Sequence, residues 1–493
     1  MSRTLNLNHF ANLPPAIARP NYRRAELRAG ILHIGIGNFH RAHQAVYLDD
    51  LFNAGRDRDW ALIGAGIRSG DRAMRQALEP QDWLTTVVEL EPGANHARVT
   101  GAMVDFVPIG EDGRAIIQAL DDPALRIVSL TITEGGYCID PGTGAFNPEH
   151  PDIAHDAAHL QAPRSVFGAI LSALERRRDR GLAPFTIMSC DNIPHNGNVA
   201  REAVAGLADL IDPSLAAYVR EQVAFPNSMV DRITPATTDR ERTALVERFG
   251  VQDNWPVFCE PFRQWVLEDH FPSGRPALEE VGVTFTPHVA AFELMKLRIL
   301  NGGHAAIAYP AGLLGIHFVH EAMEDPLLRG FLDKLEMEEI IPCVPPVPGV
   351  DLQEYYRLIA CRFSNPDVGD TIPRLAQDGS NRQPKFILPS TRDRLKAGGD
   401  VAGLALVSAL WCRYCAGLND QGRPFALDDP NASRLTPAAS AARENASAFL
   451  NLTDIFGDLS ENPVFRSRFE AALSRLWREG TRATLHAYLG GEL

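Results

Sequence analysis

Gly30-Ile-Leu-His-Ile-Gly-Ile-Gly-Asn-Phe-His-Arg-Ala-His43 is the stretch that decides the fold of this chain. Its short apolar run, residues 31–36, is typical of a buried strand. Gly35 and Gly37 interrupt this run near its end. Glycine permits backbone conformations that other residues rarely adopt, so it is common where a strand turns sharply. The stretch therefore predicts a buried strand that ends in a glycine turn.

The residues after the glycine turn favour a helix and then a second strand. Asn38 is of a residue type that caps helices, and we expect the helix to run to about Ala54. The apolar run Trp60–Ile67 predicts the second strand. Strand, glycine turn, helix and strand in this order make a βαβ unit.

The βαβ pattern continues along the first half of the chain. Strand-like runs recur at Thr85–Leu90, Arg126–Thr133 and Phe185–Cys190, with helical segments such as Arg164–Arg180 between them. This alternation predicts a doubly wound, mostly parallel sheet. Polar loops follow the last two strands, and ligands bind beyond the carboxyl ends of such strands.

The second half of the chain has a different pattern. After about residue 287, helical segments follow one another, around residues 321–337, 352–362, 401–417 and 463–489. We therefore predict an α/β protein with two domains. Residues 1–286 form a Rossmann-type doubly wound parallel sheet, and residues 287–493 form a mainly α-helical domain.

Phe292–His304 predicts a buried helix with a polar face. At about 100° per residue, Glu293, Asn301 and His304 lie at roughly 60°, 140° and 80° from Lys296. A lysine, a carboxylate, an amide and an imidazole on one side of an apolar helix indicate a site, because a stray buried lysine is costly. The alternative is a solvated helix face.

Composition excludes several classes of protein. A net charge of −14 over 493 residues argues against a non-specific binder of nucleic acid or of an anionic membrane. No apolar run reaches the length of a transmembrane helix or resembles a signal peptide. The seven scattered cysteines predict reduced thiols in the cytoplasm, and Cys412-Arg-Tyr-Cys415 fits core packing better than a metal site. The oligomeric state stays open between a monomer and a small homo-oligomer.

The glycine turn favours a dinucleotide. The N-terminus of the following helix offers backbone N–H groups to a pyrophosphate, although the third glycine of the common fingerprint is missing and a plain tight turn is the alternative. Asp71 could accept hydrogen bonds from a ribose and favour NAD, whereas Arg68 could tolerate a 2′-phosphate. His40 and His43 have the spacing of metal ligands, but no third ligand is evident nearby.

Five motifs resemble one family, the polyol-specific long-chain dehydrogenases/reductases, also called the mannitol dehydrogenase family. They are residues 35–43, Thr131-Ile-Thr-Glu-Gly-Gly-Tyr137, Ser189-Cys-Asp-Asn192, Phe225-Pro-Asn-Ser-Met-Val-Asp-Arg-Ile-Thr-Pro235, and Lys296 with Asn301-Gly-Gly-His304. The resemblance runs over essentially the whole chain. One departure is Gly70 before Asp71, where relatives are expected to carry a glutamate, which makes the preference for NAD less exclusive.

The resemblance implies a metal-independent oxidoreductase that transfers a hydride between a secondary alcohol of a sugar polyol and NAD. The reaction it favours is D-mannitol and NAD⁺ to D-fructose and NADH. D-Arabinitol, D-sorbitol and sugar acids of the fructuronate and mannonate type are alternative substrates. A Rossmann-type protein that senses a dinucleotide without turnover is an alternative from another class, but such a sensor needs no base and no oxyanion-stabilising amides.

The resemblance also implies residue roles. Lys296 would be the general base, Asn192 and Asn301 the oxyanion-stabilising amides, and Glu293 the proton relay to water. His304, Asp231, Arg374 and Lys385 would contact the substrate. The implied cofactor-binding residues are Gly35, Ile36, Gly37, Asn38, Phe39, His40, Arg41, Asp71, Thr133 and Glu134.

Overall fold

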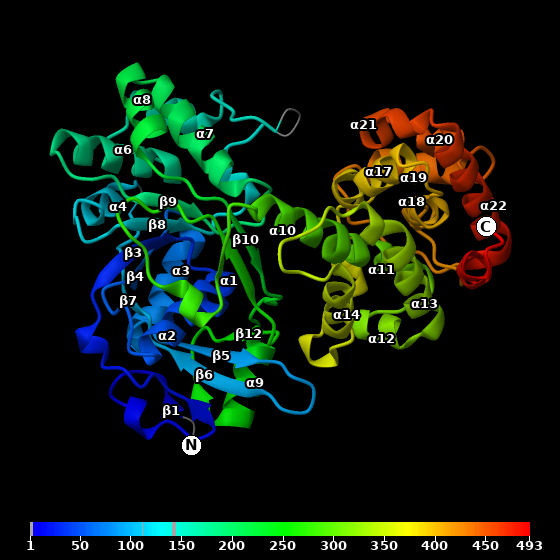
Figure 1. Cartoon of the computed structure of the whole chain (residues 1–493). Helices are drawn as coiled ribbons and strands as arrows, with labels where there is room; N and C mark the ends of the chain where they lie inside the picture. Colours follow the sequence, from blue (N-terminus) through cyan, green and yellow to red (C-terminus); the bar gives the residue numbers. More distant parts are fainter. Residues whose placement is uncertain (1–2, 111, 141–143) are drawn as a thin grey trace. The chain divides into compact units, whose positions relative to one another are not determined.

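A computed structural model describes residues 3–110, 112–140 and 144–493 of the chain (Figure 1). The chain divides into two compact units, Met1–Ala290 and Ala291–Leu493. The sequence predicts a domain boundary after residue 286, a few residues before this division. Each unit is described by itself below.

The first unit is built on a five-stranded parallel sheet with the order β7-β4-β3-β8-β9. The strands are β3 (Ala29–Ile34), β4 (Ala61–Ala65), β7 (Met103–Phe106), β8 (Ile127–Leu130) and β9 (Thr186–Ser189). From β3 the chain adds strands first on one side and then, beginning with β8, on the other. This is the predicted doubly wound sheet, and its switch point lies between β3 and β8.

One predicted strand of this sheet belongs elsewhere. The run at residues 85–90 forms β5 (Thr85–Glu89), which lies in a separate four-stranded sheet with β12 (Val257–Cys259), β6 (His96–Thr100) and β2 (Ile17–Ala18). The prediction was wrong because the chain reverses after β5 and pairs it antiparallel with β6. Two smaller sheets combine β10 (Ser228–Asp231), β13 (Gln264–Leu267) and β14 (Thr284–Phe285), and β1 (Arg3–Thr4) with β11 (Val251–Gln252).

Helices cover the five-stranded sheet on both faces, because alternate residues of β3 point into two different cores. Leu32 and Ile34 pack with the core formed by α4 (Arg114–Ala119), α6 (Val166–Asp179), α7 (Asn196–Asp209) and α8 (Pro213–Gln222). Ile31 packs with the core that includes α2 (Gln44–Asn53) and α3 (Ser69–Leu78). The remaining helices of this unit are α1 (Asn38–Ala42), α5 (Pro151–Ala158) and α9 (Asp239–Phe249).

The helix expected at residues 38–54 is broken. His43 has φ −119° and ψ −88°, which ends α1 and starts α2. Asn38 is also not the capping residue, since Gly37 occupies that position and Asn38 is the first residue of α1. The sequence pattern missed the break because apolar residues continue on both sides of it.

The second unit is helical, as predicted. Its helices are α10 (Val289–Met295, which begins just before the division), α11 (Gly302–Leu313), α12 (Val319–Glu324), α13 (Pro326–Leu335), α14 (Leu352–Phe363), α15 (Ile372–Ala376), α16 (Gly379–Arg382), α17 (Leu388–Lys396), α18 (Ala402–Cys415), α19 (Ala432–Ala441), α20 (Ser447–Leu450), α21 (Thr453–Phe456) and α22 (Pro463–Gly490). Three π-helical segments interrupt them, at Lys296–Asn301, Glu336–Ile340 and Gln383–Ile387.

Two predicted helices of this unit differ from the structure for local reasons. The segment at 321–337 breaks at Asp325, whose carboxylate accepts the N–H of Leu327 and so caps α13, with Pro326 as its first residue. The long terminal helix α22 bends at Gly480, where φ is 81°. Polar capping residues and a glycine override the apolar periodicity at these points.

All seven cysteines are unpaired, and five of them are buried. Burial raises the pKa of Cys138 to about 11 and of Cys259 to about 12. Cys361 is exposed. In the described parts of the chain, no helix is long and apolar enough to span a membrane, and no group of three or more potential ligands is arranged to hold a metal ion.

Candidate functional site

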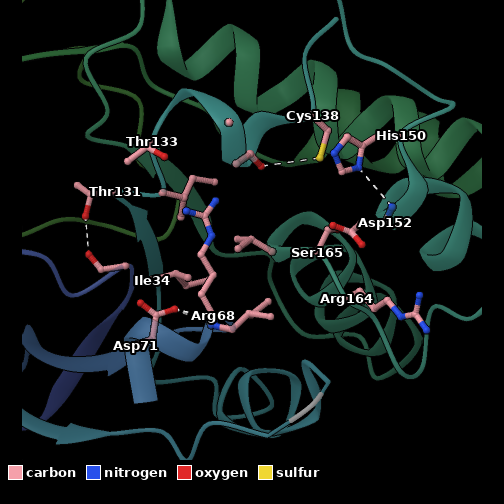
Figure 2. A pocket seen from close by; sticks show the side chains of 16 residues that line it. Ile34, Arg68, Asp71, Thr131, Thr133, Cys138, His150, Asp152, Arg164 and Ser165 are labelled. Carbon is pink, nitrogen blue, oxygen red and sulfur yellow. Dashed lines mark hydrogen bonds between the residues drawn. The ribbon is translucent and has the colours of Figure 1, made fainter. Parts of the chain in front are cut away.

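A cavity lies beyond the carboxyl ends of β3, β4 and β8, at the switch point of the five-stranded sheet (Figure 2). Its empty volume, which includes open solvent, is about 820 Å³. It is lined by Ile34, Gly35, Ile67, Arg68, Asp71, Thr131, Ile132, Thr133, Gly135, Gly136, Cys138, His150, Asp152, Arg164, Ser165 and Val166. Ligands of open α/β sheets bind at this position.

The glycine turn forms one wall of the cavity. Gly35 has φ +97°, and a Cβ atom there would lie 2.1 Å from the carbonyl oxygen of Thr131, so only glycine fits. The N–H of Gly37 donates to the carbonyl oxygen of Gly35 at 2.7 Å, which closes the turn directly before α1. The sequence prediction of a glycine turn at a ligand site agrees with this geometry.

Asp71 and Arg68, which follow β4, also line the cavity. The Oδ2 atom of Asp71 accepts the backbone N–H groups of Ile67 at 3.0 Å and of Arg68 at 2.9 Å, so this carboxylate also caps α3. Figure 2 shows the side chain of Arg68 extending from the start of α3 into the cavity. A carboxylate and a guanidinium therefore line the same wall.

The loop after β8 is held by a buried carboxylate. Asp191, which follows β9, accepts the N–H groups of Thr133 and Ile132, both at 2.9 Å, and the hydroxyl of Tyr137 at 2.8 Å. Thr133 has φ +64°, a strained conformation for a non-glycine residue. Burial raises the pKa of Asp191. This carboxylate thus fixes the cavity wall that carries Thr133 and, exposed beside it, Glu134.

The polar side chains of the first helix turn are mainly structural. The amide nitrogen of Asn38 donates to the hydroxyl of Thr237 at 2.9 Å, and its oxygen accepts from Arg41 at 2.8 Å. Arg41 is almost fully buried and also donates to the carbonyl oxygen of Trp255. These contacts hold α1 against the neighbouring loops, so a contribution of this segment to ligand binding would come from its backbone.

The remaining residues of the same motif point into the protein. Ile36 is buried, Phe39 stacks on His43 with a centroid distance of 4.8 Å, and His40 stacks on His33 at 3.5 Å. Burial lowers the pKa of His40 well below its usual value, which keeps the ring uncharged at neutral pH. None of these three residues lines the cavity.

In the second unit, the predicted polar helix contains a π-turn. The π-helix begins at Lys296 and ends at Asn301, between α10 and α11. A π-turn closes i to i+5 and holds about one residue more than an α-turn. Asn301 therefore returns close to the side of Lys296, whereas α-helical geometry places it roughly 140° away. Lys296 and Glu293 are buried, each with 7% of its surface exposed, and Asn301 is half-buried.

The glycine pair after Asn301 makes room for a neighbouring segment. A Cβ atom on Gly303 would lie 2.9 Å from the Oε1 atom of Glu336 and 3.5 Å from the ring of Phe363. Glu336 is fully buried, and burial raises its pKa well above the usual value. A side chain at position 303 would press on the buried carboxyl group of Glu336, which is a structural reason for one of the two glycines.

His304 lies one helical turn after Asn301 in a buried environment. Its ring stacks on Phe363 with a centroid distance of 4.0 Å. Its Nε2 atom is buried and has no hydrogen-bond partner among the described residues. Burial lowers the pKa of His304 to about 3, so the ring is neutral at physiological pH. A buried, unpartnered ring nitrogen is available to a ligand hydroxyl.

Charged residues surround His304. Asp370 and Arg374 both influence its pKa, and they form an ion pair in which Nε of Arg374 donates to Asp370 at 2.6 Å. The structure therefore brings Arg374, a predicted substrate contact, near His304. Arg362 and Arg382 act on the same imidazole. No periodic pattern marks these two arginines, which come from the separate helices α14 and α16.

The other predicted site residues lie at the ends of strands or on a π-helix. Asn192 is exposed just after β9, and Asp231 ends β10 with 5% of its surface exposed. Lys385 is exposed on the π-helix at 383–387. Five further residues that line the cavity were not predicted from the sequence, and these are Cys138, His150, Asp152, Arg164 and Ser165. These residues lie in the long connection before α6, where no motif marks them.

Comparisons with known proteins agree over the whole chain. Residues 29–280 match the profile of the mannitol dehydrogenase Rossmann domain, and residues 288–477 match that of the mannitol dehydrogenase C-terminal domain. A mannitol 2-dehydrogenase of Cereibacter sphaeroides is 58% identical over 96% of this chain and 99% of that protein. A mannitol 2-dehydrogenase of Aspergillus fumigatus is 41% identical over 98% of both chains.

Two solved structures are similar to this one. The ternary complex of Pseudomonas fluorescens mannitol 2-dehydrogenase with NAD and D-mannitol has a TM-score of 0.87 and 42% identity, and the match covers 99% of both chains. A D-sorbitol dehydrogenase in substrate-free form has a TM-score of 0.91 and 33% identity, with 98% of this chain and 100% of that chain covered.

Proposed function

This chain belongs to the mannitol dehydrogenase family, and we propose its function on that basis. It is an NAD-dependent mannitol 2-dehydrogenase, an oxidoreductase that interconverts D-mannitol and D-fructose. The observation that carries this conclusion is the 58% identity to a mannitol 2-dehydrogenase over 96% of the chain. The structure of a relative with NAD and D-mannitol bound supports it.

The cavity of the first unit fits a dinucleotide. It lies at the switch point of the sheet, and the φ of +97° at Gly35 forms a turn that no side chain fills. Asp71, which also lines the cavity, can accept hydrogen bonds from a ribose. When NAD⁺ is bound, its nicotinamide ring accepts the hydride. Gly35, Gly37, Asp71 and Thr133 would hold the cofactor.

The proton of the reacting hydroxyl needs a base. Lys296 takes this proton in the oxidation of the polyol, while the hydrogen on the same carbon leaves as a hydride. The oxygen that becomes a carbonyl carries negative charge in the transition state, and the amides of Asn301 and Asn192 donate hydrogen bonds to it. Lys296 is buried at the start of the π-helix, and Asn301 ends that helix, which supports their joint action on one hydroxyl.

Neighbouring side chains orient the substrate and release the proton. The neutral His304 ring, with its unpartnered Nε2 atom, binds a substrate hydroxyl, and Asp231 accepts another. Glu293, one turn before Lys296, passes the proton to water. Arg374 and Lys385 contact the outer part of the substrate. Arg374 already pairs with Asp370, so it acts as part of a fixed ion pair.

One observation favours a second substrate. The similarity to a D-sorbitol dehydrogenase, with a TM-score of 0.91 and 33% identity, makes D-sorbitol the first alternative polyol. Sorbitol and mannitol differ in the configuration of one carbon, so discrimination depends on which hydroxyls the neighbouring side chains can bind. The positive charges of Arg362, Arg374 and Arg382 around His304 make sugar acids the second alternative.

A single substrate screen tests the proposal. D-Mannitol, D-sorbitol, D-arabinitol and mannonate are offered with NAD⁺ and with NADP⁺, and NADH or NADPH formation is followed at about 340 nm. We expect the highest kcat/KM with D-mannitol and NAD⁺. A higher kcat/KM with any of the other three substrates would replace D-mannitol in this assignment, and absence of turnover with all of them would reject it.

A parallel measurement tests the lysine mechanism against a metal mechanism. We expect turnover to survive exhaustive chelation, because Lys296 and two amides supply the base and the hydrogen-bond donors. Loss of activity in chelator that Zn²⁺ restores would contradict this mechanism. The same assay without chelator gives the reference rate.

A further inference from the structure

A network of buried polar side chains lies behind the glycine turn. His33 on β3 faces Ser129 on β8, its direct cross-strand partner, with 2.8 Å between Nδ1 and the hydroxyl oxygen. Its other ring nitrogen is 2.9 Å from the hydroxyl of Thr131, and the Ser129 hydroxyl is 3.0 Å from the side-chain amide of Gln44. We call Gln44, Ser129, His33 and Thr131 the His33 network. The proposed reaction uses none of these side chains.

The direction of each hydrogen bond follows from the end of the network. The carbonyl oxygen of Gly35 can only accept, so the Thr131 hydroxyl, 2.7 Å away, donates to it. Thr131 then accepts from Nε2 of His33. Burial lowers the pKa of His33 to about 3, so the ring is neutral and its Nδ1 atom must be an acceptor. That atom receives the hydroxyl hydrogen of Ser129.

The contact between Ser129 and Gln44 determines the orientation of the Gln44 side-chain amide. In the structure the Oε1 atom of Gln44 lies 3.0 Å from the Ser129 hydroxyl. Since Ser129 donates to His33, we infer that the amide is turned over so that its nitrogen takes this place, because only that group can donate to Ser129. The amide oxygen then turns toward His40, which lies within hydrogen-bonding reach of Gln44 and otherwise has both ring nitrogens buried without a partner among the described residues. If every hydrogen bond of the network ran the other way, the Gln44 nitrogen would not donate to Ser129. His40 would not donate to Gln44, and Thr131 would not donate to the Gly35 carbonyl.

Gly35 is the point at which the network meets the cofactor cavity. Its carbonyl accepts from Thr131 and from the N–H of Gly37, each at 2.7 Å. The carbonyl of Thr131 closes the other side of this glycine, 2.1 Å from the position of a Cβ atom. The orientation of the glycine turn is therefore fixed from behind by side chains. Of the network, only Thr131 lines the cavity.

We propose that His33 is a positioning residue for the cofactor, which acts through Thr131 and the Gly35 carbonyl to hold the glycine turn in the shape that binds the pyrophosphate of the dinucleotide. Ser129 and Gln44 act through His33 by fixing its tautomer. This inference rests on the proposed function, because it assumes that the turn binds NAD.

Removing a link should weaken cofactor binding without slowing the chemical step. We expect Ser129→Ala and Thr131→Val each to raise the Kd of NADH and the KM of NAD⁺ about three- to tenfold, the range of one intramolecular hydrogen bond. Thr131→Ser, which keeps the hydroxyl, should restore normal binding. The kcat at saturating NAD⁺ and the KM of D-mannitol should change less than about twofold. Because both residues act through one network, the double variant should bind NADH as tightly as whichever single variant binds it less tightly.

Ser172→Ala is the matched control. Ser172 is fully buried in the same unit, and its hydroxyl has no partner among the described residues. This variant should bind NADH normally. NMR of histidine-labelled protein adds a direct readout, since the network requires the Nε2–H tautomer of His33 in the wild type and a loss of this preference in Ser129→Ala.

Each outcome bears on one of the two proposals. If the wild type binds no NADH, the proposed function fails. If the wild type binds NADH and Ser129→Ala binds it equally well, the positioning role is wrong. The positioning role would also be wrong if the double variant lost NADH affinity by the product of the two single losses. It would be wrong if Thr131→Ser failed to restore binding, or if His33 of the wild type carried its hydrogen on Nδ1.

Discussion

The two units build their candidate sites in different ways. In the first unit the cavity wall is shaped by backbone, with Gly35 at φ +97°, Thr133 at φ +64° and helix α3 capped by Asp71. In the second unit the site consists of side chains on one buried helix, where the π-turn from Lys296 to Asn301 sets their directions. The first site depends on conformation and the second on chemical identity.

This difference predicts two kinds of mutational effect. Changes in the second unit should remove a reacting group and lower kcat while the fold stays intact. Changes in the first unit should distort a surface and weaken the binding of the dinucleotide or the stability of the unit.

Lys296→Ala is expected to have the largest effect. Loss of a general base should lower kcat for polyol oxidation by a factor of about 10² to 10⁴ and remove the rise of kcat/KM with pH. NADH affinity, measured by fluorescence titration, should stay normal. Lys396→Ala, at an exposed lysine of α17, is the matched control. Near-native turnover in a well-folded Lys296→Ala protein would end the catalytic assignment of this helix.

Asn301→Ala should give a smaller loss of a different kind. One oxyanion donor is worth about 10² to 10³ in kcat, and its removal should leave the dependence of kcat/KM on pH in place. Asn301→Asp has the same shape but loses the donor and adds a negative charge, so it should be slower still. Equal pH profiles for Asn301→Ala and Lys296→Ala would show that the two residues do not have separate roles.

Gly35→Ala tests the conformational character of the first site. The added Cβ atom would lie 2.1 Å from a backbone oxygen at a positive φ, so we expect a loss of about 3 kcal/mol in the free energy of unfolding and weaker NADH binding. Gly37→Ala is the contrasting variant, because its Cβ atom would have no neighbour closer than 3.9 Å. It should keep its stability, as measured by urea denaturation. Equal stability losses in both variants would refute the strain argument.

Acid should affect the first unit before the second. Burial holds the pKa of His33 and His43 near 3 and lowers that of His40, whereas unfolded histidine titrates near 6.5. The unfolded chain therefore binds more protons below about pH 6.5, and each such group costs about 1.4 kcal/mol of stability per pH unit down to its folded pKa. The second unit has one comparable group, His304.

Hydrogen exchange followed by mass spectrometry at about pH 7.5 and 5.0 can separate the two units. We expect protection to fall more in the strands of the first unit than in α11 and α18. The buried Glu336 of the second unit, like Asp191 of the first, acts in the opposite direction, because its raised pKa means that the folded state holds a proton which the unfolded state loses above its ordinary pKa. This group makes the second unit more stable as the pH falls. Uniform loss of protection in acid would contradict the prediction.

Asp71→Asn should have the smallest effect. An asparagine oxygen can still accept the N–H groups of Ile67 and Arg68, so the cap of α3 remains. Removal of one charge near a 2′-phosphate is worth about 1 kcal/mol, so the ratio of kcat/KM for NADP⁺ to that for NAD⁺ should rise about fivefold. Glu79→Gln makes the same charge change at the other end of α3 and should leave the ratio unchanged. A wild-type preference for NADP⁺ would show that Arg68 decides the cofactor.

The sequence predicted the first site better than the second. Apolar runs located β3, β4, β8 and β9, and polar residues at strand ends marked the switch point, because both signals are local. The long-range contacts were not predictable in this way. Asp191, after β9, holds Thr133, after β8, and the cavity is also lined by Asp152 of α5 and by Arg164 in the loop before α6.

The second site shows a limit of helical periodicity. Counting 100° per residue placed Asn301 far from Lys296, and the π-turn corrects this. The π-turn packs against the other two π-helical segments, and a count along one helix does not include such long-range contacts. The structure changes the expected geometry of this helix, and the site formed by its four polar residues stays a prediction.

The burial of five of the seven cysteines has a practical consequence for labelling. A maleimide reacts with the thiolate, and burial both blocks access and raises the pKa of thiols such as Cys138 and Cys259. Cys361 on α14 is the one cysteine whose side chain is exposed. A fluorophore or spin label can therefore be attached to the second unit at neutral pH without prior removal of the other cysteines.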